Sequence, residues 1–243
     1  MFEFCNSRNS SLDPIERPQY EHIMNGVIFS LAGTTLTALG SGALWWEDQR
    51  MLIVSDLHLG KTERVLRRGG PAMPPYETRD TLIRLENDLQ SSNASTVICL
   101  GDSFDDVEAA KTLPEADRLW ISRLQAGRRW VWIEGNHDPG PIDLGGAHLA
   151  ELPVPPLTFR HIAQTGKSGE ISGHYHPKVR VQTRLRNISR PAFLIDSDRV
   201  ILPAYGTYTG GLRSDDNALA SLMRPEAMAI ITGQTPRQLP MPR

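Results

Sequence analysis

Three short, uninterrupted apolar runs constrain the fold of this chain more than any other feature. MLIVS (51–55), STVICL (95–100) and RWVWIE (129–134) have the continuous apolar character of strands that are buried on both faces. The segments 77–90 and 115–127 lie between them and place their apolar side chains along one helical stripe. This alternation of strand and helix predicts βαβ units and a parallel sheet.

The remaining apolar segments predict further strands on either side of this unit. Residues 27–39 and 42–48 alternate apolar and polar side chains, which favours an antiparallel hairpin or meander. The chain after residue 157 is rich in short strand-like runs, two of them joined by a hairpin turn at 195–199. Residues 64–78 contain Gly-Gly and Pro-Pro pairs, which indicates an irregular loop. We therefore expect an α/β fold in which a sandwich of sheets carries helices on its outside.

The length of the chain, 243 residues with 40% hydrophobic content, suits one large domain or two small ones. We expect a flexible leader over residues 1–22, a single domain over 23–230 and an irregular Pro-rich tail over 231–243. Cys5 and Cys99 do not make a disulfide framework and are interpreted as reduced thiols. No apolar run approaches the ~18 residues that span a bilayer, and the start lacks a signal-peptide pattern, so we expect a cytoplasmic protein without membrane contact.

Charge is unevenly distributed along the chain. The formal net charge is −2, so no global positive charge indicates nucleic-acid binding. Residues 160–190, however, contain seven Lys and Arg side chains against the single acidic residue Glu170. This segment is either a solvated basic face or an anion-binding surface, and the sequence leaves both interpretations open.

Polar residues with metal-binding side chains follow each of the three apolar runs. They are Asp56 and His58; Asp102, Asp105 and Asp106; and Asn136, His137 and Asp138. A fourth cluster, His174 and His176, has the i, i+2 spacing that places two strand side chains on one side. Because ligands bind beyond the carboxyl ends of strands in an open α/β sheet, we expect these groups to meet at one edge. Each cluster alone is also typical of a turn or a helix cap, and Asp138 in particular is interpreted as a turn residue.

The residue types in these clusters select a class of metal. Asp, Asn and His without thiolates suit first-row divalent ions such as Mn, Fe or Zn, and they do not suit a structural zinc site. One ion needs three or four protein ligands, and the clusters supply more than that. The surplus favours two ions ~3.5–4 Å apart, with a carboxylate as the bridge, as in two-metal hydrolysis sites.

Four motifs in this order, D-x-H, G-D-x-x-D, G-N-H-D and G-H-x-H, resemble those of the calcineurin-like metallophosphoesterases, and they extend from residue 56 to residue 176. The resemblance implies a four-layer α/β/β/α sandwich of two mixed sheets and a site for two divalent ions. It implies that one ion is held by Asp56, His58, Asp102 and His176. It implies that the other is held by Asp102, Asn136, His161 and His174, with Asp102 as the bridge.

Two histidines compete for the ligand position that the family has before the G-H-x-H strand. His161 fits that position, whereas His148 lies earlier, in a Gly-rich turn, and is interpreted as a structural or surface residue. His137 follows Asn136, and the resemblance implies that it faces the phosphate instead of binding metal. There it would stabilise developing charge and protonate the leaving group as a general acid, with Asp105 as its orienting partner.

A narrower resemblance covers about residues 25–225. SDLHLGKTERVLRRGG, LGDSFDD, SGHYHP and LPAYGTYTGGL are similar to segments of the bacterial ligase-associated DNA damage response endonucleases. This resemblance implies Mn-dependent cleavage of DNA phosphodiesters, with Fe, Zn or Mg as alternative ions, and a link to a DNA ligase and a helicase in DNA repair. The last segment, 202–212, is either a turn that closes a sheet or a lining of the cleft that contacts a nucleotide.

Two functions remain open from the sequence. The first is a dinuclear-metal DNA endonuclease whose substrate phosphates are bound by Lys61, Arg67, Arg180 and Arg184. The second is a phosphodiesterase or phosphomonoesterase that acts on small molecules such as cyclic nucleotides. The same metal core serves both reactions, so it does not discriminate between them.

Overall fold

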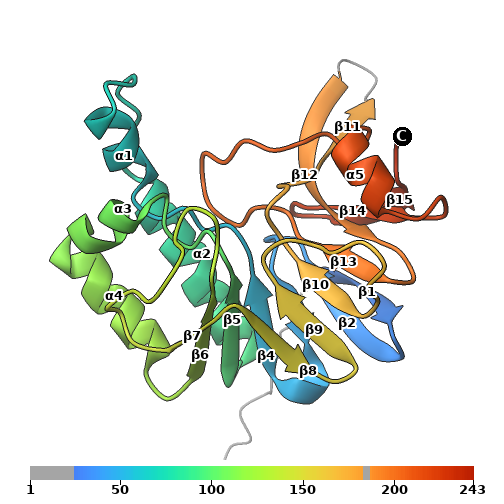
Figure 1. Ribbon diagram of the computed structural model, residues 1–243, viewed down its shortest axis with the longest axis horizontal. Coiled ribbons are helices and arrows are strands. Elements are labelled where there is room, and N and C mark those ends of the chain that lie inside the picture. Colours follow the sequence, from blue (N-terminus) through green and yellow to red (C-terminus); the bar gives the residue numbers. More distant parts are fainter. Residues whose placement is uncertain (1–24, 183–186) are drawn as a thin grey trace, which may run out of the picture.

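The protein folds into two sheets that pack face to face. A computed structural model describes residues 25–182 and 187–243, so the expected leader (1–22) and Arg184 lie outside the described residues (Figure 1). The strands of the first sheet, in spatial order, are β1 (Gly26–Leu31), β2 (Thr34–Leu39), β3 (Leu44–Trp46), β4 (Met51–Val54), β5 (Thr96–Leu100), β6 (Arg129–Ile133) and β7 (Ala147–Leu149). The pairs from β4 to β7 are parallel and those from β1 to β4 are antiparallel, so the sheet is mixed.

The second sheet is built from the later part of the chain. Its strands, in spatial order, are β15 (Arg237–Pro240), β14 (Met228–Ile231), β12 (Asn187–Ile195), β13 (Arg199–Ile201), β10 (Glu170–Ser172), β9 (Leu157–Arg160) and β8 (Glu151–Val154), and β11 (Lys178–Gln182) pairs with β12. β9, β10 and β13 are mutually parallel, whereas the other pairs are antiparallel. The 195–199 turn joins β12 to β13 as an antiparallel pair, which confirms the predicted hairpin.

Helices cover the outer faces of both sheets. The helices are α1 (Lys61–Arg67), α2 (Glu77–Ser92), α3 (Val107–Thr112), α4 (Glu115–Gln125) and α5 (Asn217–Leu222). α2 and α4 bury apolar side chains against the first sheet, and α5 packs on the second (Figure 1). A further cluster of buried side chains, which includes Ile53, Phe159 and Phe193, fills the space between the sheets. These four layers confirm the predicted α/β/β/α sandwich, because each sheet face finds an apolar partner.

Two segments differ from the expectation. Within the segment expected to be a loop, 64–78, the structure has the C-terminal part of α1 and the start of α2, and Gly-Gly and Pro-Pro occupy the connection between them. Within the expected irregular tail, 231–243, β15 pairs with β14, and Met241 is buried. An edge strand tolerates the prolines of this tail, because only one side of it must donate to a neighbour. Within the described residues, no helix combines the length and apolar character needed to cross a membrane.

Side chains on α2 provide a matched test of the outer core. Leu85 is 1% exposed and packs against the first sheet, whereas Ile83, two residues earlier, is 50% exposed. Leu85→Ala is expected to lower the free energy of unfolding by about 2–5 kcal/mol, because it leaves a cavity between helix and sheet. Ile83→Ala is expected to change it by less than about 0.5 kcal/mol. Urea denaturation of both variants checks this, and equal effects would contradict the packing described.

Candidate metal centre

The first group of candidate ligands meets where β4 and β10 end. Asp56 and His58 follow β4, and His176 follows β10. His176 Nε2 lies 3.1 Å from Asp56 Oδ1 and 3.3 Å from His58 Nε2. Burial opposes ionisation of Asp56, but its contact with His176 keeps the pKa of the carboxyl below its ordinary value. Two imidazoles and a carboxylate therefore face one point, which we call the first triad.

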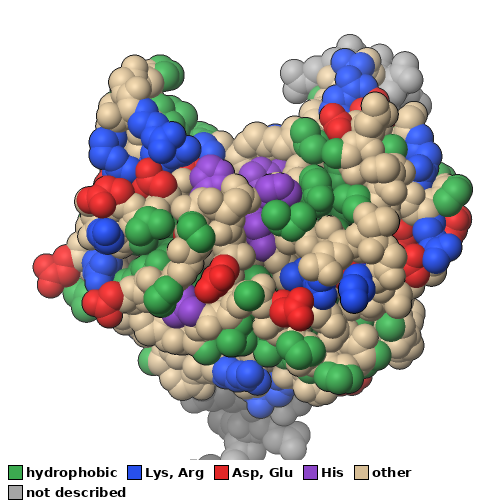
Figure 2. Space-filling view, in the orientation of Figure 1, with side chains coloured by type: hydrophobic (Ala, Val, Ile, Leu, Met, Phe, Trp, Pro, Cys, Tyr) green, Lys and Arg blue, Asp and Glu red, His purple; other side chains and the backbone are tan. Residues whose placement is uncertain are grey.

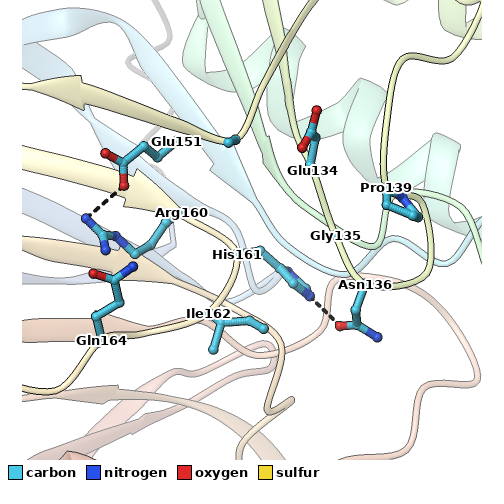
Figure 3. Close-up of a pocket in the computed structure, with 10 residues that line it drawn as sticks. Glu134, Gly135, Asn136, Pro139, Glu151, Arg160, His161, Ile162 and Gln164 are labelled. Carbon is cyan, nitrogen blue, oxygen red and sulfur yellow. Dashed lines mark hydrogen bonds and ion pairs between the residues drawn. The ribbon is translucent and has the colours of Figure 1, made fainter.

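The second group meets where β5, β9 and β10 end, beside the end of β6. The second triad consists of Asp102, His161 and His174, whose ligand atoms also lie close together. His161 Nε2 is 3.5 Å from Asp102 Oδ2 and 3.2 Å from His174 Nδ1. Asn136 extends this triad, because its Oδ1 lies 2.9 Å from His161 Nε2 (Figure 3). Burial opposes ionisation of Asp102, but His161 lowers the pKa of its carboxyl to about 2.

The donor atoms of both triads suit divalent cations. Each triad supplies imidazole nitrogens and one carboxylate without thiolate, a set that binds Mn, Fe or Zn. Asp56 Oδ1 is buried and makes no hydrogen bond of good geometry among the described residues, although His176 Nε2 lies 3.1 Å away, so it can bind a cation. His161 Nδ1 contacts the carbonyl of Leu100 at 2.7 Å, so its Nε2 is the nitrogen available to a metal. These residues fit the metal ions that the sequence predicts.

Unusual backbone conformations bring these ligands together. Five of the seven candidate ligands have positive φ, although none is glycine: Asp56, His58, Asp102, His174 and His176. The left-handed region costs most residues of order 1–3 kcal/mol, and such residues cluster at functional sites. Gly135 lets two of the turns approach closely, because a Cβ there would lie 2.1 Å from Asp102 N. The turns are therefore shaped for the convergence of their side chains.

Asp105 has a different partner from the one that the sequence predicts. Its carboxylate Oδ1 lies 2.9 Å from His58 Nδ1, and its Oδ2 accepts from Arg64 Nη1 at 2.8 Å. Lys61 Nζ lies 3.4 Å from the same carboxylate. Burial opposes ionisation, but His58, Lys61 and Arg64 hold the pKa of Asp105 well below its usual range. The carboxylate therefore orients His58, because metal-binding histidines are typically held through their second nitrogen.

His137 is held by a main-chain group. Its Nδ1 lies 2.8 Å from the carbonyl oxygen of Asp105, so this nitrogen carries a proton and donates. Its Nε2 lies 4.0 Å from Asp102 Oδ2, on the side of the second triad. The backbone N–H of His137 also donates to Asp102 Oδ1 at 2.8 Å. Asp105 thus orients His137 through its backbone, and its side chain serves His58.

Asp138 fixes the two turns that carry Asp102 and Asn136. Its carboxylate accepts from the backbone N–H groups of Asp102, Ser103, Phe104 and Gly135. Burial raises the pKa of Asp138 to about 6, although these donors favour its ionised form. The sequence interpretation of Asp138 as a plain turn residue missed this role. Its place beside Asn136 and His137 was the one available signal.

The other predicted site residues lie around the two triads. Lys61 and Arg67 of α1 contact the carboxylates of Asp105 and Asp106, with Arg67 Nη2 2.7 Å from Asp106. Arg180 is exposed on β11. His148 stacks on Trp132 in the first sheet, away from both triads, as expected for a structural residue.

A pocket of about 450 Å³ opens beside the second triad. Asn136 and His161 line it, together with Glu134, Ile162 and Gln164 (Figure 3). The guanidinium of Arg160 is buried at its side, where it contacts Glu151 at 3.0 Å and Glu170 at 3.4 Å. The pocket therefore has acidic, amide and apolar walls next to the candidate metal ligands.

The four-layer fold and the two triads define a metal-dependent hydrolase. The family model for calcineurin-like phosphoesterases matches residues 49–233, and the chain belongs to this family. The protein is accordingly a metal-dependent phosphoesterase. It is also similar to a solved structure, the Pseudomonas putida nuclease MPE, with 27% identity and a TM-score of 0.70 over 88% of this chain and 100% of that one. No curated protein matches the chain.

The contacts of Asp138 generate a test of this site. Asp138→Ala leaves four buried backbone N–H groups without a hydrogen-bond acceptor. Each such group costs about 1–3 kcal/mol of stability, so we expect a clear decrease in the free energy of unfolding. We also expect metal affinity to fall about 10–100-fold, as for other partners that orient ligands. Metal titration and urea denaturation measure both effects. Asp143→Ala, an exposed change in the following loop, is the control, and equal behaviour of the two variants would exclude the role of Asp138.

Proposed function

We propose that the protein is a dinuclear-metal phosphodiesterase that cuts DNA internally. The observation that carries the proposal is the pair of adjacent triads at the ends of four strands, in a chain that is similar over 88% of its length to a nuclease. Figure 2 shows histidines at the floor of a hollow between two projections, which are α1 on one side and the β11–β12 hairpin on the other. An open hollow of this kind admits a polymer, whereas small substrates are usually enclosed.

The proposed ligand sets follow the two triads. The first ion would be held by Asp56, His58, His176 and Asp102. The second would be held by Asp102, Asn136, His161 and His174. Asp102 is the proposed bridge, because each of its two oxygens can bind one cation. When bound, such ions polarise the phosphate and lower the pKa of water so that it attacks near neutral pH.

His137 is the proposed general acid. Its Nδ1 already donates to the Asp105 carbonyl, so its Nε2 carries a proton only in the imidazolium form. In that form Nε2 donates to the oxygen that leaves the phosphorus, and the neutral imidazole remains. Asp105 supports this step through its carbonyl and, through its carboxylate, keeps His58 in place.

Cationic side chains on both projections support a polyanionic substrate. Arg67 ends α1 and Arg68 follows it, Arg180 lies on β11 and Arg190 on β12, and all four are exposed. The charges of Lys61 and Arg67 are partly neutralised by Asp105 and Asp106, so we expect a weaker contribution from them. The proposal includes Mn²⁺ as the metal ion that supports catalysis. It also includes a function in DNA repair, together with a DNA ligase and a helicase.

The first test is cleavage of an end-labelled single-stranded oligonucleotide with Mn²⁺. We expect internal cuts by the wild-type protein. His137→Ala should cut at least about 100-fold more slowly while it retains its metals, because a general acid typically contributes 10²–10⁴-fold. Asp102→Ala should lose metals and activity together. Metal analysis of each variant accompanies the gels.

The outcomes separate the alternatives. If the oligonucleotide stays intact while a small phosphodiester is hydrolysed, the protein is a small-molecule phosphoesterase and the endonuclease proposal is wrong. If the metal content falls in His137→Ala, His137 is a ligand and the assignment of the acid fails.

Charge on β11 gives a separate prediction. Arg180→Glu should slow cleavage more at low salt than at high salt and reduce the slope of log rate against log salt by about 1, because fewer counterions are released. Arg129→Glu is the matched control, since Arg129 is exposed at the opposite end of β6 from the metal centre. An unchanged slope in Arg180→Glu would mean that this basic face is only solvated.

A further inference from the structure

Two tyrosines stand next to the first triad in positions that metal binding does not explain. Tyr76 precedes α2 and is 53% exposed. Tyr208 lies in the loop after β13, and the centroids of the two rings are 5.5 Å apart with an interplanar angle of 56°. Removing an exposed aromatic ring from water is favourable, so a paired ring that stays exposed suggests a ligand that covers it.

Backbone contacts fix both tyrosines close to the first triad. Gly206, two residues before Tyr208, donates from its N–H to the carbonyl of Asp56 at 3.0 Å. Thr78, two residues after Tyr76, accepts from the N–H of Gly60, which itself follows His58 by two residues. The segments that carry the two tyrosines are thus hydrogen-bonded to the turn that carries the first two candidate ligands.

The loop that carries Tyr208 is fastened to α2, directly behind Tyr76. In Figure 1 the chain after β13 runs from the second sheet across to the α1–α2 side. There the Tyr205 hydroxyl donates a hydrogen bond to Asp88 at 2.8 Å. The N–H of Thr207 donates to Thr81 Oγ1 at 3.1 Å, and Thr207 Oγ1 accepts from Arg84 at 2.9 Å. Tyr208 itself has a φ of 63°, a left-handed conformation that side chains other than glycine seldom adopt. The pair is therefore preorganised, which reduces the entropy lost on binding.

From this arrangement we infer that Tyr76 and Tyr208 form a stacking subsite for the base of a nucleotide next to the scissile phosphate. The inference rests on the proposed function and adds a binding site to it. Every base has a π-face, so the subsite accepts any base and contributes affinity without reading sequence. Tyr76 supplies the exposed ring, and Tyr208 packs against it and limits its rotation.

The test uses a set of single-stranded oligonucleotides of one sequence. Each carries one abasic residue at a different position, and every phosphate is retained. Cuts are mapped at each phosphodiester with Mn²⁺. For the wild-type protein we expect cutting to fall about 10-fold at one fixed offset from the abasic residue, which is the size of a lost stacking contact. In Tyr76→Ser and Tyr208→Asn this local decrease in cutting, called the dip below, should disappear. Asn tolerates the left-handed conformation, so Tyr208→Asn is expected to keep the loop folded.

Control variants separate stacking from general damage. Tyr76→Phe retains the ring and should retain the dip. Leu119→Ala changes an exposed apolar side chain on α4 and should also leave it unchanged. Metal content and thermal midpoints of all variants show whether each is folded.

Each outcome decides the inference. A dip in the wild type that both tyrosine variants lose supports the subsite. Uniform cutting of the abasic strands by the wild type would overturn the subsite and leave the endonuclease proposal intact. A dip that persists in both variants would assign the base contact to other residues. No cutting of any oligonucleotide, with small phosphodiesters hydrolysed, would overturn the proposed function and this inference with it.

Discussion

The convergence of five strand ends on one edge is the constraint on which the rest of the structure depends. β4, β5 and β6 are parallel in the first sheet, β9 and β10 are parallel in the second, and each is followed at once by a candidate ligand. After β4, β5 and β10 the turns that bring the side chains together include residues in left-handed conformations. Such turns are unfavourable alone, so the surrounding contacts must hold them.

Those contacts come from buried polar groups, both Asp138, which is not a candidate ligand, and two of the candidate ligands themselves. Asp138 binds four backbone N–H groups and thereby joins the turn after β5 to the turn after β6. Across the two sheets, Asp56 Oδ2 accepts from the N–H of His174 at 2.9 Å. His161 Nδ1 reaches the carbonyl at the end of β5 in the same way. The candidate ligands are thus held in place by contacts within the fold, which favours metal affinity because little order is gained on binding.

The sequence predicts the position of the site better than its supporting contacts. Strand ends with carboxylates and imidazoles are visible because buried parallel strands are continuous apolar runs and their carboxyl ends share an edge. The partners of Asp105 and Asp138 are not visible, because they depend on which way each turn folds. Asp105 shows this well, since its carbonyl and its carboxylate serve different histidines. α1 was hidden for a related reason: the glycines and prolines after it dominate the local pattern, while its own residues pack against neighbouring elements.

The residues that surround the first triad differ in charge from those that surround the second. This difference bears on which substrates the metal centre can accept. Arg64 of α1 binds Asp105, which contacts His58, so a cationic surface is connected to a candidate ligand through one carboxylate. On the second triad the neighbouring pocket is lined by acidic and amide groups and by Arg160, whose charge is paired with Glu151 and Glu170, so among the described residues its lining offers no unpaired Lys or Arg to a phosphate. Any nucleotide has both kinds of group, because an uncharged sugar and base stand beside its phosphate. For the proposed function, the arrangement suits a substrate that has such an uncharged group next to the phosphate that is cut.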